Sequence, residues 1–280
     1  MRISGCTVVR NAVIMGYPVV EAIRSILPLV DEYVVAVGRS DPKLRIVDTI
    51  WDTTKTTGGL ILSEKTNEAL AHCTGDWIFY LQADEVVHED DLPRIRAACA
   101  RHLDDARVEG LLFRYVHFYA SYSVVATSRY WYRNEVRIVR AGRGVASVGD
   151  AQSFLVGGPA GRKPRVMRSD GTIMHYGWVK PPEQMGVKHL HFNRWYKGDA
   201  DDAKYGEGYR FPMQYGLRRW HGAHPHVMHE RVRTQSWRFE PEVRPGDWTR
   251  KDWRALASDL LERATGKLWG ERRKYVLLER

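Results

Sequence analysis

The first hundred residues alternate between short apolar runs and amphipathic stretches. The apolar runs at 3–9, 32–37 and 76–81 have the length and composition of buried strands. Residues 17–30 instead place apolar side chains at helical spacing, with Pro18 in the first turn. Strands separated by helices form right-handed crossovers, so the pattern predicts an α/β fold with a mostly parallel mixed sheet flanked by helices.

The same reading extends along the chain. Residues 59–62 are predicted to form a short third strand, followed by a helix with Ser63 as its N-cap. Acidic residues in the first turn of 89–103 suit a helix N-terminus. Residues 108–119 are typical of a long strand, and 134–140 alternate like a strand at the edge of the sheet.

The pattern changes in the second half of the chain. Residues 141–172 are Gly-rich and predicted to be loops with short strands around Phe154 and Val166. Helices are expected from 181 to about 197 and from 249 to 265. We therefore expect a catalytic domain over 1–180 and a helical or irregular C-terminal extension over 181–280.

Polar clusters follow three of the expected strands: Arg10-Asn11, residues 38–41 and residues 82–85. In a parallel sheet such strand ends share the edge where ligands bind. The sequence has no G-x-G-x-x-G after its first strand and no Walker-type loop, which disfavours dinucleotide-binding and P-loop folds. In FYLQADEVV (79–87), the acids after the apolar run form either a polar turn or a cation site.

Bulk composition excludes several classes of protein. A chain of 280 residues with 44% hydrophobic residues can bury a sizeable core, and no stretch approaches the roughly 18 apolar residues of a membrane span. Arg10 and Asn11 interrupt the first apolar run, so a secretory signal is not expected. Three cysteines without metal-type spacing indicate reduced core thiols, and together these features favour a cytoplasmic protein.

Positive charge concentrates toward the C-terminus. The formal net charge is +9, and residues 181–280 carry 20 Lys/Arg against 14 Asp/Glu together with six of the ten tryptophans. A basic, aromatic-rich segment suits an anionic partner such as a nucleoside diphosphate, nucleic acid or lipid headgroups. Peripheral binding to the inner membrane face and binding of nucleic acid therefore stay open.

Four segments resemble the family 2 glycosyltransferases, which have the nucleotide-sugar-binding GT-A fold. The resemblance covers roughly residues 2–180 and rests on VVRNA (8–12), SIL…DEYVVAVGRSDPK (25–43), TNEAL…GDWIFYLQADE (66–85) and WYRNEVRIVR (131–140). It implies metal-dependent, inverting transfer of a sugar from a nucleoside-diphosphate donor to an acceptor hydroxyl. A UDP-sugar is the first expectation for the donor, and a glycan, lipid-linked sugar or small molecule for the acceptor.

The resemblance also implies a metal site. Gln82-Ala83-Asp84-Glu85 stands where the family has its D-x-D motif, with Gln82 in place of the first acid. Asp84 is then the ligand of Mn²⁺ or Mg²⁺, which prefer oxygen ligands, and Glu85 assists through water. His175 matches a late metal-binding histidine of the family, and a structural histidine is the alternative.

Further donor contacts are implied by the same resemblance. The acid pair that the family places after its second strand is replaced here by Val37-Gly38-Arg39, so Arg39 is expected to contact phosphate. Arg10 and Asn11 are expected to line the nucleotide pocket, with a simple strand-end turn as the alternative. Lys65 and Asn67 either approach the donor or form an exposed helix face.

An inverting transfer needs a base that takes the proton of the acceptor hydroxyl. Asp150 in SVGDAQSF (147–154) matches the position of the family's base, and a loop-capping aspartate is the alternative. Glu135 and Asp170 are rival candidates. Lys180, just after His175, is a candidate to steady the diphosphate.

Two other functions stay open on the sequence. The tail interleaves cations with aromatic rings, as in NRWYK (193–197) and TRKDWR (249–254), which permits a glycosyltransferase that acts on modified nucleic acid. Gln82 permits a scaffold that binds nucleotide sugars without turnover. The histidines of HGAHPHVMH (221–229) fit no usual zinc spacing, so an acceptor-side loop is preferred there.

Overall fold

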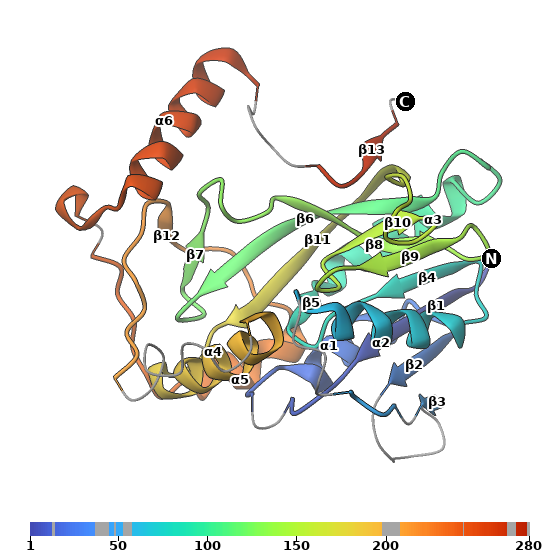
Figure 1. Ribbon diagram of the computed structural model, residues 1–280, viewed down its shortest axis with the longest axis horizontal. Helices are drawn as coiled ribbons and strands as arrows, with labels where there is room; N and C mark the ends of the chain where they lie inside the picture. Colours follow the sequence, from blue (N-terminus) through green and yellow to red (C-terminus); the bar gives the residue numbers. More distant parts are fainter. Residues whose placement is uncertain are drawn as a thin grey trace.

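The computed structural model describes residues 1–12, 15–36, 45–47, 49–52, 58–197, 208–242, 244–267 and 273–278. A mixed sheet lies at the centre and runs in the order β12-β7-β6-β8-β4-β1-β2-β3 (Figure 1). Its parallel part consists of β1 (Ile3–Val8), β2 (Glu32–Ala36), β3 (Arg45–Val47) and β4 (Trp77–Tyr80). Antiparallel pairing then adds β8 (Asn134–Arg140), β6 (Gly110–Tyr119), β7 (Val124–Ala126) and β12 (Leu217–Arg219).

A long strand, β11 (Arg165–Trp178), runs parallel to β6 and carries the sheet toward the candidate site. It also pairs with β5 (Glu85–Val87), antiparallel, and with β13 (Val276–Leu277), parallel. A separate hairpin consists of β9 (Val145–Val148) and β10 (Ser153–Val156). Strands from beyond residue 180 thus belong to the central sheet.

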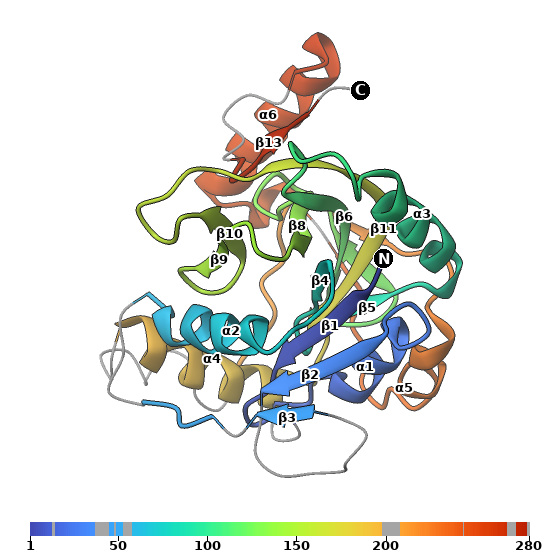
Figure 2. The ribbon, with the colours of Figure 1, turned by 90° about the vertical axis from the view of Figure 1, so that its right-hand side faces the viewer.

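Helices cover both faces of the sheet. Figure 2 shows α2 (Leu60–Ala71) on one side of the parallel strands, and α1 (Val19–Ile26) and α3 (Leu92–Arg101) on the other. The remaining helical segments are η1 (Glu89–Asp91), α4 (Pro182–Lys197), η3 (His226–Met228), α5 (His229–Arg233), η4 (Pro245–Asp247) and α6 (Arg250–Thr265). Thr249 and Asp252 form a capping box that starts α6, as the expected helix boundary requires.

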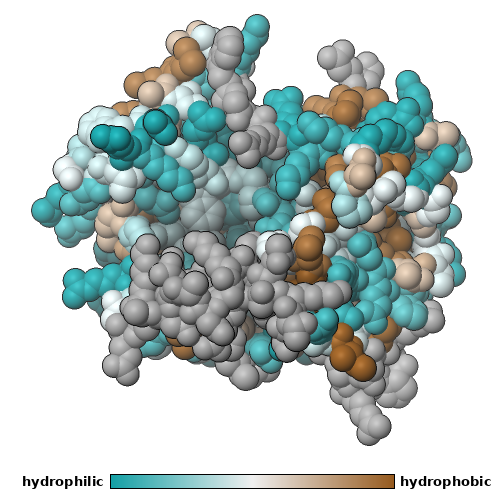
Figure 3. Space-filling view, in the orientation of Figure 1, coloured by the Kyte–Doolittle hydropathy of each residue, from teal (hydrophilic) through white to brown (hydrophobic). Residues whose placement is uncertain are grey.

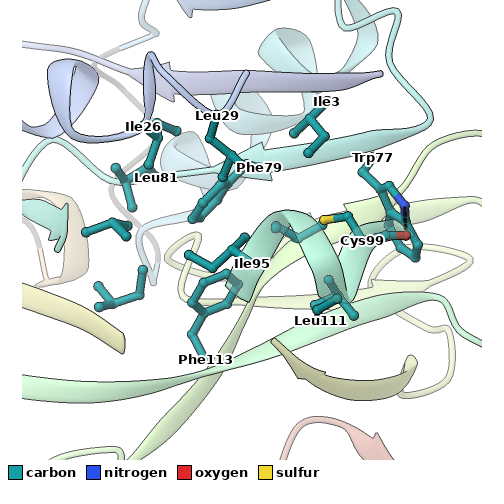
Figure 4. Packing of buried hydrophobic residues seen from close by; sticks show 14 of the residues in the cluster. Ile3, Ile26, Leu29, Trp77, Phe79, Leu81, Ile95, Cys99, Leu111 and Phe113 are labelled. Atoms are coloured by element: carbon teal, nitrogen blue, oxygen red, sulfur yellow. Dashed lines mark hydrogen bonds between the residues drawn. The ribbon is translucent and has the colours of Figure 1, made fainter. Parts of the chain in front are cut away.

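Alternation along the strands divides the interior into two cores. Successive side chains of a strand point to opposite faces. Trp77 and Phe79 therefore join the core beneath α1 and α3, whereas Ile78 and Tyr80 join the core beneath α2. Figure 4 shows the first core, in which Phe79 and Phe113 stack at a centroid distance of 5.0 Å. Burial on both faces explains why β4 is apolar at every position.

Three expectations about elements were wrong. Residues 60–62 begin α2 instead of forming a strand, so the N-cap of that helix is Gly59 and not Ser63, and the third parallel strand is β3. A run of three apolar residues is too short to distinguish the two periods. The strand at 134–140 lies inside the sheet between β4 and β6, not at its edge.

The third concerns β11, which is one strand of 14 residues where short pieces were expected. Asp170, at φ 61°, marks an irregularity between two pairing registers with β6. The residues at this irregularity, Ser169-Asp170-Gly171, are typical of a turn, so the sequence pattern predicts a break where the strand continues.

No helix in the described part of the chain is both long and apolar enough to cross a membrane. Hydrophilic side chains cover much of the face in Figure 3, and a hollow lies below α6.

Candidate active site

A pocket of about 350 Å³ lies where β1 and β4 end, at the edge of the sheet that binds ligands in parallel α/β folds. The chain segments that follow these strands supply Arg10, Gln82 and Asp84, while β11 supplies His175 and α4 supplies Lys188. The other lining residues are Val8, Met15, Tyr17, Trp51, Leu62, Thr66, Tyr80, Ala83, Tyr132, Asp150, Ala151, Gln152, Trp178 and His189. Segments distant in sequence therefore converge on one cavity.

Asp84 is the most strongly perturbed acid of the pocket. Its Oδ2 lies 3.6 Å from His175 Nε2 and 3.9 Å from Lys188 Nζ. Burial alone raises the pKa of Asp84, but its interaction with His175 and the nearby charges of Lys188 and Lys180 outweigh burial and hold that pKa well below its usual range. Asp84 is thus an anion placed to attract a cation.

Two lysines lie beside Asp84 around the ring of Tyr17. Lys188 Nζ donates to the Gly177 carbonyl at 2.7 Å and lies 5.1 Å from the Tyr17 ring centroid. Lys180 is 1% exposed, and its Nζ lies 4.2 Å from the same centroid with no hydrogen-bond partner within the described residues. Burial, followed by repulsion from Lys188, lowers the pKa of Lys180 well below its ordinary value. Of the two lysines, only Lys188 lines the pocket that an anion could enter.

Asp84 and His175 offer one oxygen and one nitrogen to a divalent cation. Gly177 keeps these atoms uncovered: a Cβ added to it would contact Asp84 Oδ2 and would lie 2.6 Å from His175 Nε2. The described residues contain no group of three or more His, Cys, Asp or Glu that could hold a metal ion. Two protein ligands fit Mg²⁺ or Mn²⁺ when phosphate oxygens and water complete the shell, as is usual for nucleotide-bound cations.

Glu85, expected to assist the cation, is directed into the interior instead. Arg137 Nη2 donates to its Oε1 at 2.8 Å and Arg137 Nε to its Oε2 at 2.9 Å, and both side chains are fully buried. Tyr115 Oη donates to the same carboxylate at 2.8 Å. Glu85 does not line the pocket. Its Oε2 accepts a hydrogen bond from the backbone N–H of Gln82 at 3.1 Å, which stabilises the turn between β4 and β5. Of the two adjacent acids, Asp84 lines the pocket and Glu85 stabilises the interior.

Asp150, the expected base, lines the pocket on the segment between β9 and β10. Its Oδ1 accepts a hydrogen bond from the backbone N–H of Gln152 at 3.3 Å. This is the loop-capping contact expected as the alternative to a base, and the same side chain also lines the pocket. Of its rivals, Asp170 is exposed on β11 and Glu135 is buried beneath Gln152. Burial raises the pKa of Glu135 to about 7, against the lowering effect of Arg137. Neither rival lines the pocket.

The other expected donor contacts are divided. Gln82 lines the pocket, where its Nε2 donates to the Ala151 carbonyl at 3.2 Å. Arg10 also lines it, with its guanidinium 5.2 Å from the ring centroid of Trp51. Asn11 is exposed, does not line the pocket and adopts φ 54°, which agrees with the alternative of a strand-end turn. Arg39 lies outside the described residues.

Lys65 and Asn67 are not brought to the pocket. Lys65 forms an ion pair of 2.8 Å with Glu68 on its own helix. Asn67 makes two hydrogen bonds to the backbone of Ser147, which joins α2 to β9. The face of α2 that lines the pocket consists of Leu62 and Thr66, spaced one helical turn apart.

Several pocket residues were not predicted from sequence, chiefly Tyr17, Trp51, Tyr132, Lys188 and His189. Met185, which is fully buried, stands three and four positions before Lys188 and His189 on α4. This helical spacing indicates an inward-facing side of α4 and is the one sequence signal for its contribution. The aromatic residues carry no comparable signal, because tyrosine and tryptophan also occur in ordinary cores.

Of the four histidines of 221–229, His224 packs against the neighbouring core, whereas His221, His226 and His229 are exposed. His224 is hydrogen-bonded to the Tyr176 hydroxyl at 2.9 Å and to the Tyr122 carbonyl at 3.1 Å. Trp220 and Trp237 pack partly buried against the neighbouring core. Trp220 and Trp237 therefore serve packing, whereas Trp253 on α6 is 50% exposed.

Comparisons with known proteins give only distant matches. No protein-family model and no curated protein matches the chain. A crystal structure of S. aureus TarS 1–349 in complex with UDP matches with 12% identity over 72% of this chain and 68% of that chain, at a TM-score of 0.37. Glucosyl-3-phosphoglycerate synthase from Mycobacterium tuberculosis, in complex with Mn²⁺, UDP and glucosyl-3-phosphoglycerate, matches with 19% identity over 42% and 44%, at a TM-score of 0.27. Another TarS 1–349 structure is matched over 47% of its own length, at a TM-score of 0.30 and 13% identity over 50% of this chain.

Proposed function

We propose that this protein is a glycosyltransferase that moves a sugar from a nucleoside-diphosphate donor, with a UDP-sugar as the first candidate, to an acceptor hydroxyl. The observation that carries the proposal is the convergence of Asp84, His175, Asp150 and Lys188 on one pocket at the carboxyl ends of β1 and β4. An acid with a depressed pKa, buried lysines and a second carboxylate are the groups that this chemistry requires. The family 2 resemblance of residues 2–180 agrees with this assignment.

The donor binds in this proposal with its diphosphate toward Lys188 and Lys180. The positive charge of the lysines balances the phosphate oxygens as the diphosphate leaves. Asp84 and His175 would hold Mn²⁺ or Mg²⁺, which supplies further neutralisation of the leaving group when bound. Arg10 and Trp51 form the side of the pocket available to the nucleoside.

Asp150 acts as the base in the proposed inverting transfer. Its carboxylate takes the proton of the acceptor hydroxyl while the acceptor oxygen forms a bond to the anomeric carbon. The bond between that carbon and the diphosphate oxygen breaks, and its electron pair leaves with the diphosphate. Since Lys188 and His189 come from α4, residues 181–280 contribute to the donor site in addition to any role toward the acceptor.

Donor hydrolysis by wild type and Asp84→Asn tests the proposal. A panel of nucleoside-diphosphate sugars is incubated with Mn²⁺, and release of the nucleoside diphosphate is measured. Asp84→Asn keeps the side-chain shape and removes its charge, so we expect a loss of at least about a hundredfold. Asp90→Asn, at a side chain 82% exposed, is the matched control and should retain wild-type turnover.

The outcomes separate the alternatives. Wild-type protein that binds a donor and never turns it over supports the scaffold without catalysis. Asp84→Asn with wild-type turnover would show that the chemistry lies elsewhere.

A further inference from the structure

His117 lies beside His175 on the neighbouring strand and does not line the pocket. The two residues are partners in the register of the parallel strands β6 and β11. His117 is 3% exposed and is enclosed by the rings of Tyr115, Tyr132 and Trp131, at centroid distances of 5.4, 4.4 and 5.1 Å. Such an enclosed imidazole must satisfy its two nitrogens within the protein.

Its hydrogen bonds determine where its proton resides. His117 Nε2 lies 2.7 Å from the Tyr132 carbonyl oxygen, which only accepts, so Nε2 carries the hydrogen. A charge on this buried ring would be costly, because its hydrogen-bond partners are a backbone carbonyl and another imidazole and not a carboxylate. The ring is therefore neutral, and its Nδ1 carries a lone pair.

The tautomer of His175 follows from that of His117. The two Nδ1 atoms are 3.0 Å apart, so one donates and the other accepts. Because His117 Nδ1 has no hydrogen, His175 Nδ1 must donate. In neutral His175 the other ring nitrogen, Nε2, then presents a bare lone pair toward the pocket, 3.6 Å from Asp84 Oδ2.

We infer that His117 is a positioning residue: by accepting the Nδ1–H of His175, it fixes the tautomer in which His175 Nε2 faces the pocket as a ligand beside Asp84. The inference rests on the proposed function, since the lone pair has a use only if a divalent cation binds there with the donor. A hydrogen bond to the second nitrogen of a metal-binding histidine typically changes metal affinity by about 10- to 100-fold. Here a second histidine, unusually, provides that bond.

The test compares His117→Phe with His117→Gln. Phenylalanine keeps the ring shape and removes both hydrogen bonds, whereas glutamine offers an acceptor to His175 and a donor to Tyr132. Affinity for Mn²⁺ in the presence of UDP is measured from the free Mn²⁺ signal in electron paramagnetic resonance. We expect His117→Phe to weaken Mn²⁺ binding at least about tenfold and His117→Gln to stay within about threefold of wild type.

A second readout needs no metal and no activity. In wild-type protein with ¹⁵N-labelled histidine, nuclear magnetic resonance should assign the Nδ1–H tautomer to His175 and the Nε2–H tautomer to His117. This measurement decides the question even if His117→Phe does not fold. An Nε2–H tautomer at His175 overturns the inference.

The remaining outcomes distinguish the inference from the function beneath it. If wild type binds UDP and Mn²⁺ and His117→Phe binds both equally well, the inference fails and the proposed function stands. Wild type that binds UDP but no Mn²⁺ also overturns the inference. Wild type that binds no nucleoside diphosphate under any condition contradicts the proposed function itself.

Discussion

At the scale of the residue, the proposed cation site consists of two atoms, Asp84 Oδ2 and His175 Nε2, which lie 3.6 Å apart. One follows β4 and the other lies on β11, so strand pairing and not local sequence brings them together. Gly177, two residues beyond His175, leaves the space beside both atoms open. Any larger residue at position 177 would place its Cβ against these two atoms.

Gly177→Ala should therefore damage the site without unfolding the protein. The new methyl would lie 2.6 Å from His175 Nε2 and would also contact Asp84 Oδ2, so it should displace both. We expect at least a tenfold loss of Mn²⁺ affinity in the presence of UDP, measured by titration calorimetry. Gly246→Ala, where an added Cβ meets nothing within 4 Å, is the control. Wild-type affinity in Gly177→Ala would contradict the assigned position of the cation.

At the scale of the residue, the sequence predicts which segments reach the pocket better than it predicts how each side chain is oriented. Asp84, Gln82 and Arg10 were placed in the pocket by their position after buried strands. The sequence does not distinguish the roles of Glu85 and Asp84, because both are acidic. Only the fold shows that Glu85 forms a buried ion pair with Arg137. The site roles themselves, including that of Asp150, stay predictions.

At the scale of the element, the buried pair of Glu85 and Arg137 joins β5 to β8 and supports the turn that carries Asp84. Arg137 Nη1 also donates to the Gln152 carbonyl at 2.9 Å, near Asp150. One ion pair thus holds two segments of the pocket. A buried pair of this kind contributes more to arrangement than to net stability.

Arg137→Met should destabilise the protein by about 3–5 kcal/mol, because it leaves the Glu85 carboxylate buried and unpaired. The double variant Glu85→Gln/Arg137→Met removes both charges and should recover part of that loss. Urea denaturation of both variants measures the difference. Equal stability of the single and double variants would mean that the buried charge is not the cause.

Elements were predictable where the hydrophobic pattern is long and local. The strands β1, β2 and β4 and the helices α1, α4 and α6 follow from the hydrophobic pattern and, for α1, from Pro18. The interior position of β8 depends on pairing with β4 and β6, which are distant in sequence, so no local pattern reveals it. The predicted fold class was therefore correct, whereas the order of the strands in the sheet could not be predicted from the sequence.

At the scale of the whole molecule, the C-terminal hundred residues complete the structure begun by the first 180. They supply β12 and β13 to the central sheet and Lys188 to the pocket. Their excess of positive charge, +6 of the total +9, includes that lysine and suits an anionic donor. Composition thus agrees with the anionic donor that we propose, and the pocket includes one of these lysines.

Thermal unfolding of the wild-type protein with UDP, with and without Mn²⁺, tests the central claim most directly. A ligand that binds only the folded state at about 100 times its dissociation constant adds about 2.7 kcal/mol of stability. We predict that UDP raises the melting temperature, that Mn²⁺ increases the shift, and that Asp84→Asn removes the Mn²⁺-dependent part. No shift with UDP or any other nucleoside diphosphate, with or without Mn²⁺, would contradict the account.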